Sequence, residues 1–441
     1  MTLKRNSTLI FLLLFCFSLA QAQWVSQWHG FISARGINHI QAVNANVVWA
    51  TAFDAGNLAI PINEFTRTVN GGLDWTPGFV TGASGLQSAG IFALNPDTAW
   101  VVMQNPSDTG GYICRTNDGG LNWTRMDSAV FHVNPVFVHF WNEDQGLCIG
   151  NPYNGRFEIY TTLDGGINWM PVAANNIPVS QADEYALNTS FCVQGDTVWF
   201  GGNTYGKIFV SHDNGKHWSF LPSPISTMKK VIFYDSLSGL VGRVGLDGDS
   251  WELYETHDRG MTWSSVNASG TVNTADLAFV PGTEKTFVSV GFRMSFTNDA
   301  GSSWLAFGQP SPLTSPYFHC VNFIDPSTGW AGGMNTFSPS GGIYKYAGPA
   351  LAIQQNDPTT QQFVVYPNPA TENVNIFTQG FEHGKAQLSL YNLVGQEIQS
   401  QTLVLNDQDF NQLSLQGLNP GIYFLRLSQN HIVLHKELIV K

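Results

Sequence analysis

The sequence predicts an all-β fold. Three observations support this prediction: the composition, an eight-residue motif that recurs six times, and a strand–turn–strand pattern that recurs seven times. Charged residues make up only 12% of the 441 residues and aromatic residues make up 13%, with 44 glycines and 21 prolines. Low charge combined with many aromatic side chains argues against a disordered chain and against long solvated helices. Abundant glycine, aromatic and β-branched residues favour short strands joined by tight turns.

The net charge of the chain is −12. A nucleic-acid-binding protein normally carries a basic stripe or patch, and no such run of Lys and Arg is visible in the sequence. We therefore expect no nucleic-acid partner.

The first 22 residues have the three parts of a signal peptide. Lys4 and Arg5 precede a largely apolar run over 9–20, and Ala20-Gln21-Ala22 forms a small-x-small cleavage site. The run is too short to span a bilayer, and no other segment reaches the length of a membrane helix. We expect an exported mature chain with no transmembrane helix.

The cysteines that remain after the signal peptide show no CxxC motif and no paired spacing, which argues against a zinc site. We expect them to be small buried hydrophobic residues, and the sequence leaves their redox state open. They are Cys114, Cys148, Cys192 and Cys320. No other pattern indicates a metal or a cofactor, and we expect neither.

An octet with the pattern [ST]-x-[DN]-x-G-x-x-W occurs at 68–75, 116–123, 162–169, 211–218, 256–263 and 297–304. Each of its elements suits a tight hairpin. In the second copy, Asp118 can accept hydrogen bonds from turn amides, Gly120 can adopt a positive φ, and Trp123 can fold beneath the turn. We predict a structural turn role for the third position of every copy: Asn70, Asp118, Asp164, Asp213, Asp258 and Asp299.

A second signal recurs in step with the octet. It is an apolar strand, a polar turn and a short strand anchored by a bulky residue at 49, 100, 147, 199, 240, 287 or 330. Each unit then contains four short strands within 40–50 residues, which is the period of a β-propeller blade. Seven such strands and six octets predict a seven-bladed β-propeller over 23–349 whose last blade lacks an outer strand. We predict that the N-terminal strand around 24–27 supplies it and closes the ring.

The octet resembles the Asp-box (BNR) repeat of sialidase-like propellers and of the propeller of a photosystem II assembly factor. The resemblance covers 23–349 and implies a propeller in which the boxes are structural turns on the face away from the ligand site. It does not select a function. Asn70 departs from the family pattern, because Asp is usual at that position.

After the repeats, the polar segment 350–362 has the composition of a linker. Period-2 alternation over 363–441 predicts a small C-terminal β-sandwich. The segments YPNP (366–369), LYNLVGQEI (390–398) and NPGIYFLRL (419–427) resemble the type A C-terminal sorting domain of the type IX secretion system. This resemblance implies that the secretion machinery handles 363–441 and that the protein reaches the outer surface or the surroundings of a Gram-negative bacterium. The alternative is a carbohydrate-binding sandwich fused to a propeller.

Polar and aromatic residues follow the second strands, where the loops of the ligand-binding face of a propeller are expected. The candidates are Asn151, Tyr153, Asn203, Tyr205, Arg243 and Arg293. Amides provide hydrogen bonds and tyrosine provides stacking surface, so this loop face could bind a glycan or a protein ligand.

No HExxH, GxSxG, GxGxxG or P-loop motif is present, and we assign no catalytic residue. A non-catalytic binding or scaffolding role is therefore the favoured interpretation, with a glycoside hydrolase on the same fold as the alternative. A sialidase-like enzyme would need three arginines to converge, and the candidates are Arg35, Arg243 and Arg293. A glucanase-like enzyme would need carboxylates across a cleft, and the candidates are Asp247, Asp249 and Glu252.

Overall fold

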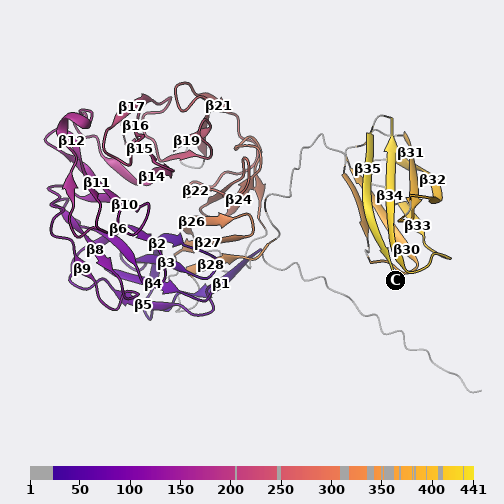
Figure 1. Cartoon of the computed structure of the whole chain (residues 1–441), viewed down its shortest axis with the longest axis horizontal. Coiled ribbons are helices and arrows are strands. Elements are labelled where there is room, and N and C mark those ends of the chain that lie inside the picture. The colour runs from indigo at the N-terminus through magenta and orange to yellow at the C-terminus, as the bar shows by residue number, and fades with distance from the viewer. Residues whose placement is uncertain are drawn as a thin grey trace, which may run out of the picture. The chain divides into compact units, whose positions relative to one another are not determined.

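In the computed structural model, seven four-stranded antiparallel sheets form a ring (Figure 1), which confirms the predicted seven-bladed β-propeller. The structure describes residues 23–203, 206–245, 250–307, 317–334, 342–348, 351, 362–366, 369–379, 381, 384–393, 395–405, 411–430 and 432–441. The predicted signal peptide, Tyr205, Asp247 and Asp249 lie outside these residues. The chain divides into two units, Met1–Gln354 and Gln355–Lys441.

In blades 1 to 6 the four strands run in chain order from the inner to the outer edge. Blade 1 comprises β2 (Arg35–Ala42), β3 (Val48–Asp54), β4 (Glu64–Thr68) and β5 (Thr76–Phe79), and blade 2 comprises β6 (Gln87–Ala93), β7 (Ala99–Gln104), β8 (Gly111–Thr116) and β9 (Thr124–Arg125). Blade 3 comprises β10 (Pro135–Phe140), β11 (Gly146–Tyr153), β12 (Arg156–Thr162) and β13 (Met170–Pro171), and the short helix η1 (Ala174–Asn176) follows it. Blade 4 comprises β14 (Ala186–Gln194), β15 (Thr197–Gly202), β16 (Lys207–Ser211) and β17 (Ser219–Pro222).

The remaining blades repeat this order. Blade 5 comprises β18 (Lys230–Phe233), β19 (Gly239–Val244), β20 (Trp251–Thr256) and β21 (Ser264–Val266), and blade 6 comprises β22 (Asp276–Phe279), β23 (Phe287–Val290), β24 (Met294–Thr297) and β25 (Leu305–Ala306). Blade 7 takes β26 (Phe318–Asp325), β27 (Thr328–Gly333) and β28 (Gly342–Tyr346) from one end of the propeller sequence and β1 (Trp24–Trp28) from the other.

The N-terminal strand closes the ring, as predicted. β1 pairs antiparallel with β28, with Trp24 opposite Tyr346. The Trp24 side chain is only 1% exposed, and its ring meets Phe307, Phe323 and Tyr346 edge-on at centroid distances of 5.8, 5.8 and 5.3 Å. Closure therefore combines a hydrogen-bonded strand pair with a buried aromatic anchor.

The bulky residues that mark the second strands are all buried, between 0 and 4% exposed. Three of them are tryptophans with a cation directly opposite on the third strand, and that cation lies over the indole ring. The pairs are Arg67 over Trp49 at 5.3 Å, Arg115 over Trp100 at 5.4 Å and Lys345 over Trp330 at 5.3 Å. These cation–π contacts join the second and third strands of a blade beyond their backbone pairing.

Each octet forms the turn between the third and fourth strands. In box 2, the Thr116 hydroxyl accepts the Gly120 N–H at 2.9 Å and donates to Asp118 Oδ1 at 2.9 Å, and the same carboxylate oxygen accepts the Asn122 N–H at 2.9 Å. Gly120 has a φ of 83°, a conformation that favours glycine. The equivalent three bonds occur in all six boxes, and Asn70 takes the Asp position in box 1.

Strand direction decides which face the boxes occupy. Because the strands of a blade alternate in direction, the boxes lie at the same end as the turns between first and second strands. The loops between second and third strands, and the connections from one blade to the next, lie at the opposite end, which we call the loop face. The candidate residues that the structure describes, Asn151, Tyr153, Asn203, Arg243 and Arg293, belong to the loop face.

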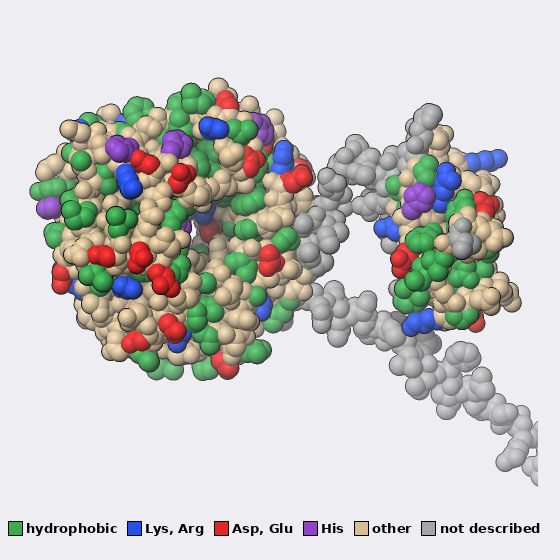
Figure 2. All heavy atoms as spheres, viewed as in Figure 1, with side chains coloured by type: hydrophobic (Ala, Val, Ile, Leu, Met, Phe, Trp, Pro, Cys, Tyr) green, Lys and Arg blue, Asp and Glu red, His purple; other side chains and the backbone are tan. Residues whose placement is uncertain are grey.

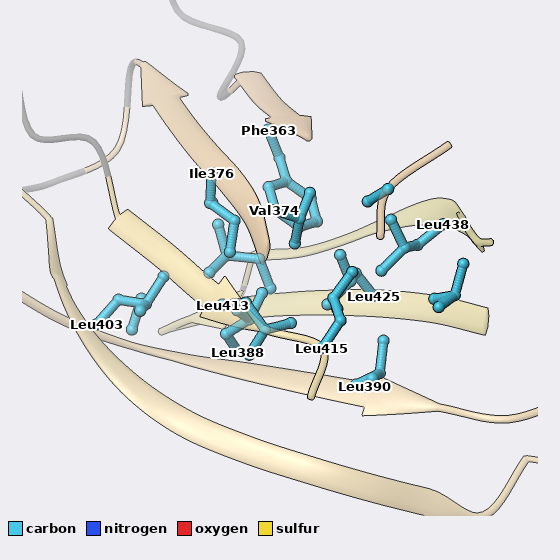
Figure 3. Close-up of a cluster of buried hydrophobic side chains, with 14 of the residues drawn as sticks. Phe363, Val374, Ile376, Leu388, Leu390, Leu403, Leu413, Leu415, Leu425 and Leu438 are labelled. Carbon is cyan, nitrogen blue, oxygen red and sulfur yellow. The ribbon is translucent and has the colours of Figure 1, made fainter. Parts of the chain in front are cut away.

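The C-terminal unit consists of two sheets, in agreement with the predicted β-sandwich. One has the order β29 (Gln362–Tyr366), β30 (Asn373–Gln379) and β33 (Asn411–Ser414). The other has the order β32 (Glu397–Leu405), β31 (Gly384–Tyr391), β34 (Gly421–Gln429) and β35 (Ile432–Val440). Phe363, Val374 and Leu413 from the first sheet pack with Leu388 and Leu425 from the second in one core (Figure 3).

Several smaller findings bear on the sequence predictions. All four cysteines of the described chain are free, and Cys114, Cys148 and Cys320 are buried. Leu351, at the start of the predicted linker, is 4% exposed and packs into the core of the last blades. In the residues that the structure describes, no helix is long and apolar enough to cross a membrane.

Candidate functional site: a groove on the loop face

A groove of about 850 Å³ opens on the loop face over blades 2, 3 and 4. Its walls come from the β7–β8 loop, the hairpin between β11 and β12, and the long connection from blade 3 to blade 4. The lining includes Asp108, Asn151, Ser180, Glu184 and Tyr185. Asn151 is one of the residues predicted from the sequence.

Asn151 is held in place by the backbone around it. Its Oδ1 accepts the N–H of Ala186 at 3.0 Å, and its own N–H donates to the carbonyl of Asn134 at 2.9 Å. The Asn134 amide in turn donates to Asp108 Oδ1 at 2.6 Å. Hydrogen bonds therefore connect the side chains of this wall across blades 2, 3 and 4, which makes the wall rigid.

Tyr153 lies at the end of the same strand and is 43% exposed. Its ring stacks on His132 with a centroid distance of 4.0 Å and an interplanar angle of 1°. Glu158 holds the imidazole through a 2.7 Å contact between Nδ1 and Oε1, and its other oxygen accepts the N–H of Val133 at 3.0 Å. The hairpin thus presents a fixed aromatic surface.

Asn203, which was predicted from the sequence, forms two hydrogen bonds with the backbone of Tyr185. Its Oδ1 accepts the Tyr185 N–H at 2.8 Å, and its own N–H donates to the Tyr185 carbonyl at 2.9 Å. These two hydrogen bonds fix the backbone of Tyr185. Tyr185 lines the groove and is 46% exposed. Asn203 therefore positions an aromatic side chain of the groove.

The groove carries negative charge. Asp108, Asp183 and Glu184 line it, whereas the part of its wall that the structure describes contains no Lys or Arg. The Glu184 side chain is fully buried, accepts the Gln181 N–H at 2.9 Å and lies 3.9 Å from Lys207 Nζ. A cationic group on a ligand would therefore meet an attractive field at this surface.

The predicted arginines lie elsewhere. Arg243 on β19 is bound to Glu252 on β20, with Nε and Nη2 at 2.9 and 2.8 Å from the same carboxylate oxygen. Arg293 is exposed in the turn between β23 and β24 on blade 6. Of the predicted residues, Asn151 lines the groove and Asn203 holds Tyr185, which lines it. Tyr153 stacks on His132 outside the lining, and Arg243 and Arg293 are not part of the lining either.

Two of the three arginines that the sialidase alternative would need, Arg35 and Arg243, already form ion pairs with carboxylates of their own blades. Arg35 is bound within blade 1 to Glu64 at 2.7 Å and to Asp54 at 3.1 Å, and the hydrogen bonds that Arg35 donates to Glu64 are the main cause that raises its pKa. Arg243 is bound to Glu252 as described above. These ion pairs already use several of the guanidinium donors that a substrate carboxylate would need.

Sequence reasoning missed Tyr185, His132 and Glu184. All three lie in connections between blades or at their ends, which carry no repeated motif. The one available signal was length, because the connection from Pro171 to Ala186 is longer than the other connections between blades, and long loops are common places for binding residues. Within the described residues, no group of three or more His, Cys, Asp and Glu could hold a metal ion.

Residues 364–441 match the family model described as a secretion system C-terminal sorting domain. The match agrees with the tail motifs and indicates that the chain is secreted or displayed at the outer surface. A comparison with curated protein sequences finds no match.

Solved structures share the propeller fold. The chain is similar to a structure titled YCF48 bound to D1 peptide, with a TM-score of 0.54 and 15% identity over 75% of this chain and 97% of the other. It is also similar to YCF48 from Cyanidioschyzon merolae, with a TM-score of 0.52 and 16% identity over 74% of this chain and 98% of the other. A Hadza microbial sialidase aligns with a TM-score of 0.40 and 12% identity over 72% of this chain and 66% of the other.

Proposed function

We propose that this protein is an exported β-propeller that binds a ligand without catalysis in the loop-face groove of blades 2–4. Its type IX sorting tail would deliver it to the outer surface or the surroundings of a Gram-negative cell after removal of the signal peptide. The observation that carries the proposal is the fixed placement of Tyr185 and Asn151 in one groove. Preorganised aromatic and amide groups reduce the entropy cost of binding.

The charge and shape of the groove favour a polypeptide segment with a basic side chain over a glycan. Backbone amides can pair with fixed polar groups of the wall, a ligand methylene chain can pack on Tyr185, and a Lys or Arg of the ligand can approach Asp183 and Asp108. A structure of similar fold carries a bound peptide in its title, which agrees with this ligand class.

The test uses the mature chain, 23–441, on arrays of random peptides and of glycans. We expect binding to peptides that contain Lys or Arg, with affinity reduced about tenfold or more by Tyr185→Ala, because buried tyrosines are frequent energetic centres of interfaces. Asp183→Asn should weaken binding and reduce its dependence on salt. Phe79→Ala is the matched control, since Phe79 is an exposed aromatic residue on the outer strand of blade 1.

Two results would contradict the proposal. Peptide binding that survives Tyr185→Ala unchanged would remove the groove as its location. Turnover of chromogenic glycosides by the wild-type chain would instead support the hydrolase alternative.

A further inference from the structure

The central channel of the ring contains a cavity of about 390 Å³. All seven inner strands contribute to its lining, and the space-filling view shows the opening at the centre of the ring (Figure 2). This cavity is separate from the groove on blades 2–4, because the two share no lining residue. It has its own set of polar and aromatic groups.

A large β-bulge in β14 directs Asn188 into this channel. Ala186 pairs with Gly202 and Phe191 pairs with Phe200, so a step of five residues on β14 faces a step of two on β15. The bulges in β2, β6, β10 and β26 near the same end add one residue each. Bulges re-aim side chains and are frequent next to functional sites.

Asn188 reaches His39 on a blade that is not its neighbour in the ring. Its Nδ2 donates to His39 Nε2 at 3.2 Å, which joins blade 4 to blade 1 across the channel. Because Nε2 accepts, Nδ1 carries the proton and donates to the Thr51 hydroxyl at 3.2 Å. His39 is thereby fixed in one tautomer, and the Asn188 carbonyl oxygen has no hydrogen-bond partner among the described residues.

His139 provides a second polar group. It lines the cavity between Phe92 and Trp141, with ring centroids at 4.8 and 5.0 Å. Neither of its ring nitrogens has a hydrogen-bond partner in the described part of the chain. Burial lowers the pKa of His139 to about 4, so at neutral pH the ring offers one donor and one acceptor and no charge.

The charges of the cavity cancel. Lys230 Nζ lies 2.6 Å from Asp276 Oδ1, and Asp276 also accepts the backbone N–H groups of Leu277 and Val321 at 2.9 and 3.1 Å. This ion pair provides the only Lys, Arg, Asp or Glu side chains in the described lining. A charged ligand would gain no counter-charge there and would still lose its hydration.

Aromatic surface completes the cavity. Phe137 on β10 stacks on Phe191 on β14 with a centroid distance of 4.1 Å and an angle of 6°. Fixed aromatic walls combined with a few unpaired neutral donors and acceptors are what a sugar ring requires, since it has an apolar C–H face and a rim of hydroxyls. The volume lies in the range of small-ligand sites.

We propose that the central channel is a second binding site, which takes a neutral sugar of about monosaccharide size between Phe137 and Phe92, with His139 and Asn188 as its hydrogen-bonding groups. The site does not depend on the function proposed for the groove.

The experiment measures sugar binding to the mature chain by saturation-transfer NMR and calorimetry. The neutral probes are glucose, galactose, mannose and N-acetylglucosamine, and the charged probes are glucuronate and glucosamine. We expect at least one neutral sugar to bind and the charged forms to bind at least tenfold more weakly. His139→Phe, which keeps an aromatic ring and removes both nitrogens, and Asn188→Ala should each weaken binding at least tenfold.

Phe79→Ala is the matched control and should leave sugar binding unchanged, because Phe79 is an exposed aromatic residue on the outer strand of blade 1 and lines neither the channel nor the groove. Should a channel variant fail to fold, the ring resonances of His139 in the wild-type chain give an independent readout, and they must shift when the bound sugar is added. The proposal is overturned if no neutral sugar binds, if charged sugars bind equally well, if the His139 resonances do not move, or if Phe79→Ala weakens binding as much as the channel variants do.

Discussion

Lys345 of blade 7 donates a hydrogen bond of 2.9 Å to the carbonyl oxygen of Gly71 in the box of blade 1. The same ammonium lies over Trp330 of its own blade. Arg67 makes a related contact one seam further on, because it lies over Trp49 and donates to the carbonyl of Pro96 in the turn between β6 and β7 of blade 2. The seam at which the ring closes is therefore built like a seam between blades that follow each other in the chain.

The first prediction concerns closure by β1. Trp24→Ala should lower the free energy of unfolding by about 3–5 kcal/mol, because it removes a buried indole and leaves a cavity among Phe307, Phe323 and Tyr346. Urea denaturation checks this value. Trp28→Ala is the control, since Trp28 lies on the same strand and is 55% exposed, and it should change stability by no more than about 0.5 kcal/mol. Equal effects of the two variants would argue against closure by a buried anchor.

The second prediction concerns the boxes. Thr116→Val keeps the shape of the side chain but leaves the N–H of Gly120 without its acceptor, so we expect a loss of about 1–3 kcal/mol. The comparison is Thr124→Val on the next strand of the same blade, where the side chain is exposed. If the two variants unfold at the same urea concentration, the hydroxyl of the box is not a stabilising element.

The third prediction concerns the ion pair in the channel. Asp276→Ala should destabilise the ring by about 3–5 kcal/mol, because it leaves Lys230 as an uncompensated buried charge. Adding Lys230→Met in the same chain should restore part of the loss. A double variant that is less stable than Asp276→Ala would show that Lys230 contributes through packing rather than through its charge.

The fourth prediction is a loss of stability at acidic pH. Burial lowers the pKa values of His39 and His139 to about 4, against about 6.5 in an unfolded chain. The folded state binds these protons less readily than the unfolded state. The contribution of the two histidines to the free energy of unfolding is therefore fully present above about pH 6.5 and is lost as the pH falls toward about 4. Each histidine contributes up to about 1.4 kcal/mol per pH unit in that window.

Unfolding midpoints measured at several pH values from about 7.5 down to about 4 check this prediction. His139→Phe should give a flatter profile than the wild type, since one of the histidines with a lowered pKa can no longer take up a proton. A wild-type profile that stays level from neutral to acidic pH would contradict it.

The fifth prediction concerns the tail. Because 363–441 has a hydrophobic core of its own, its removal should leave the propeller folded. The truncated chain should remain in the periplasm, because the sorting signal is missing. Cell fractionation and circular dichroism test both parts. Normal surface display of the truncated protein would refute the sorting role.

Much of the fold could be predicted because its determinants are local. The octet contains the hydroxyl, the carboxylate or amide, the glycine and the indole of one turn. The distance along the sequence between successive octets therefore indicates the length of each blade directly. Counting seven second strands against six octets was enough to predict that β1 completes blade 7. The cation–π pairs of Trp49 and Trp330 depend on which residues face each other across two strands, and the repeat pattern does not specify that register.

The site could be predicted only in part. The sequence could place Asn151, Tyr153 and Asn203 on the loop face, because Asn151 and Tyr153 lie at the end of the second strand of blade 3 and Asn203 follows that of blade 4. Tyr185 was missed because it lies in a connection without a repeat. Asn188 was missed because three additional residues in β14 change the side-chain alternation, and a bulge of that size cannot be read from hydrophobic periodicity.

The pairing of β1 with β28 also sets an order of events during export. A polypeptide that crosses the inner membrane with its N-terminus leading releases β1 first, yet the partner of that strand is the last one of the propeller to emerge. Its sheet can form only once nearly the entire ring sequence is on the far side. Until then β1 has no partner strand and Trp24 is exposed to water. A periplasmic chaperone that holds unfolded chains would bind the leading segment in this state.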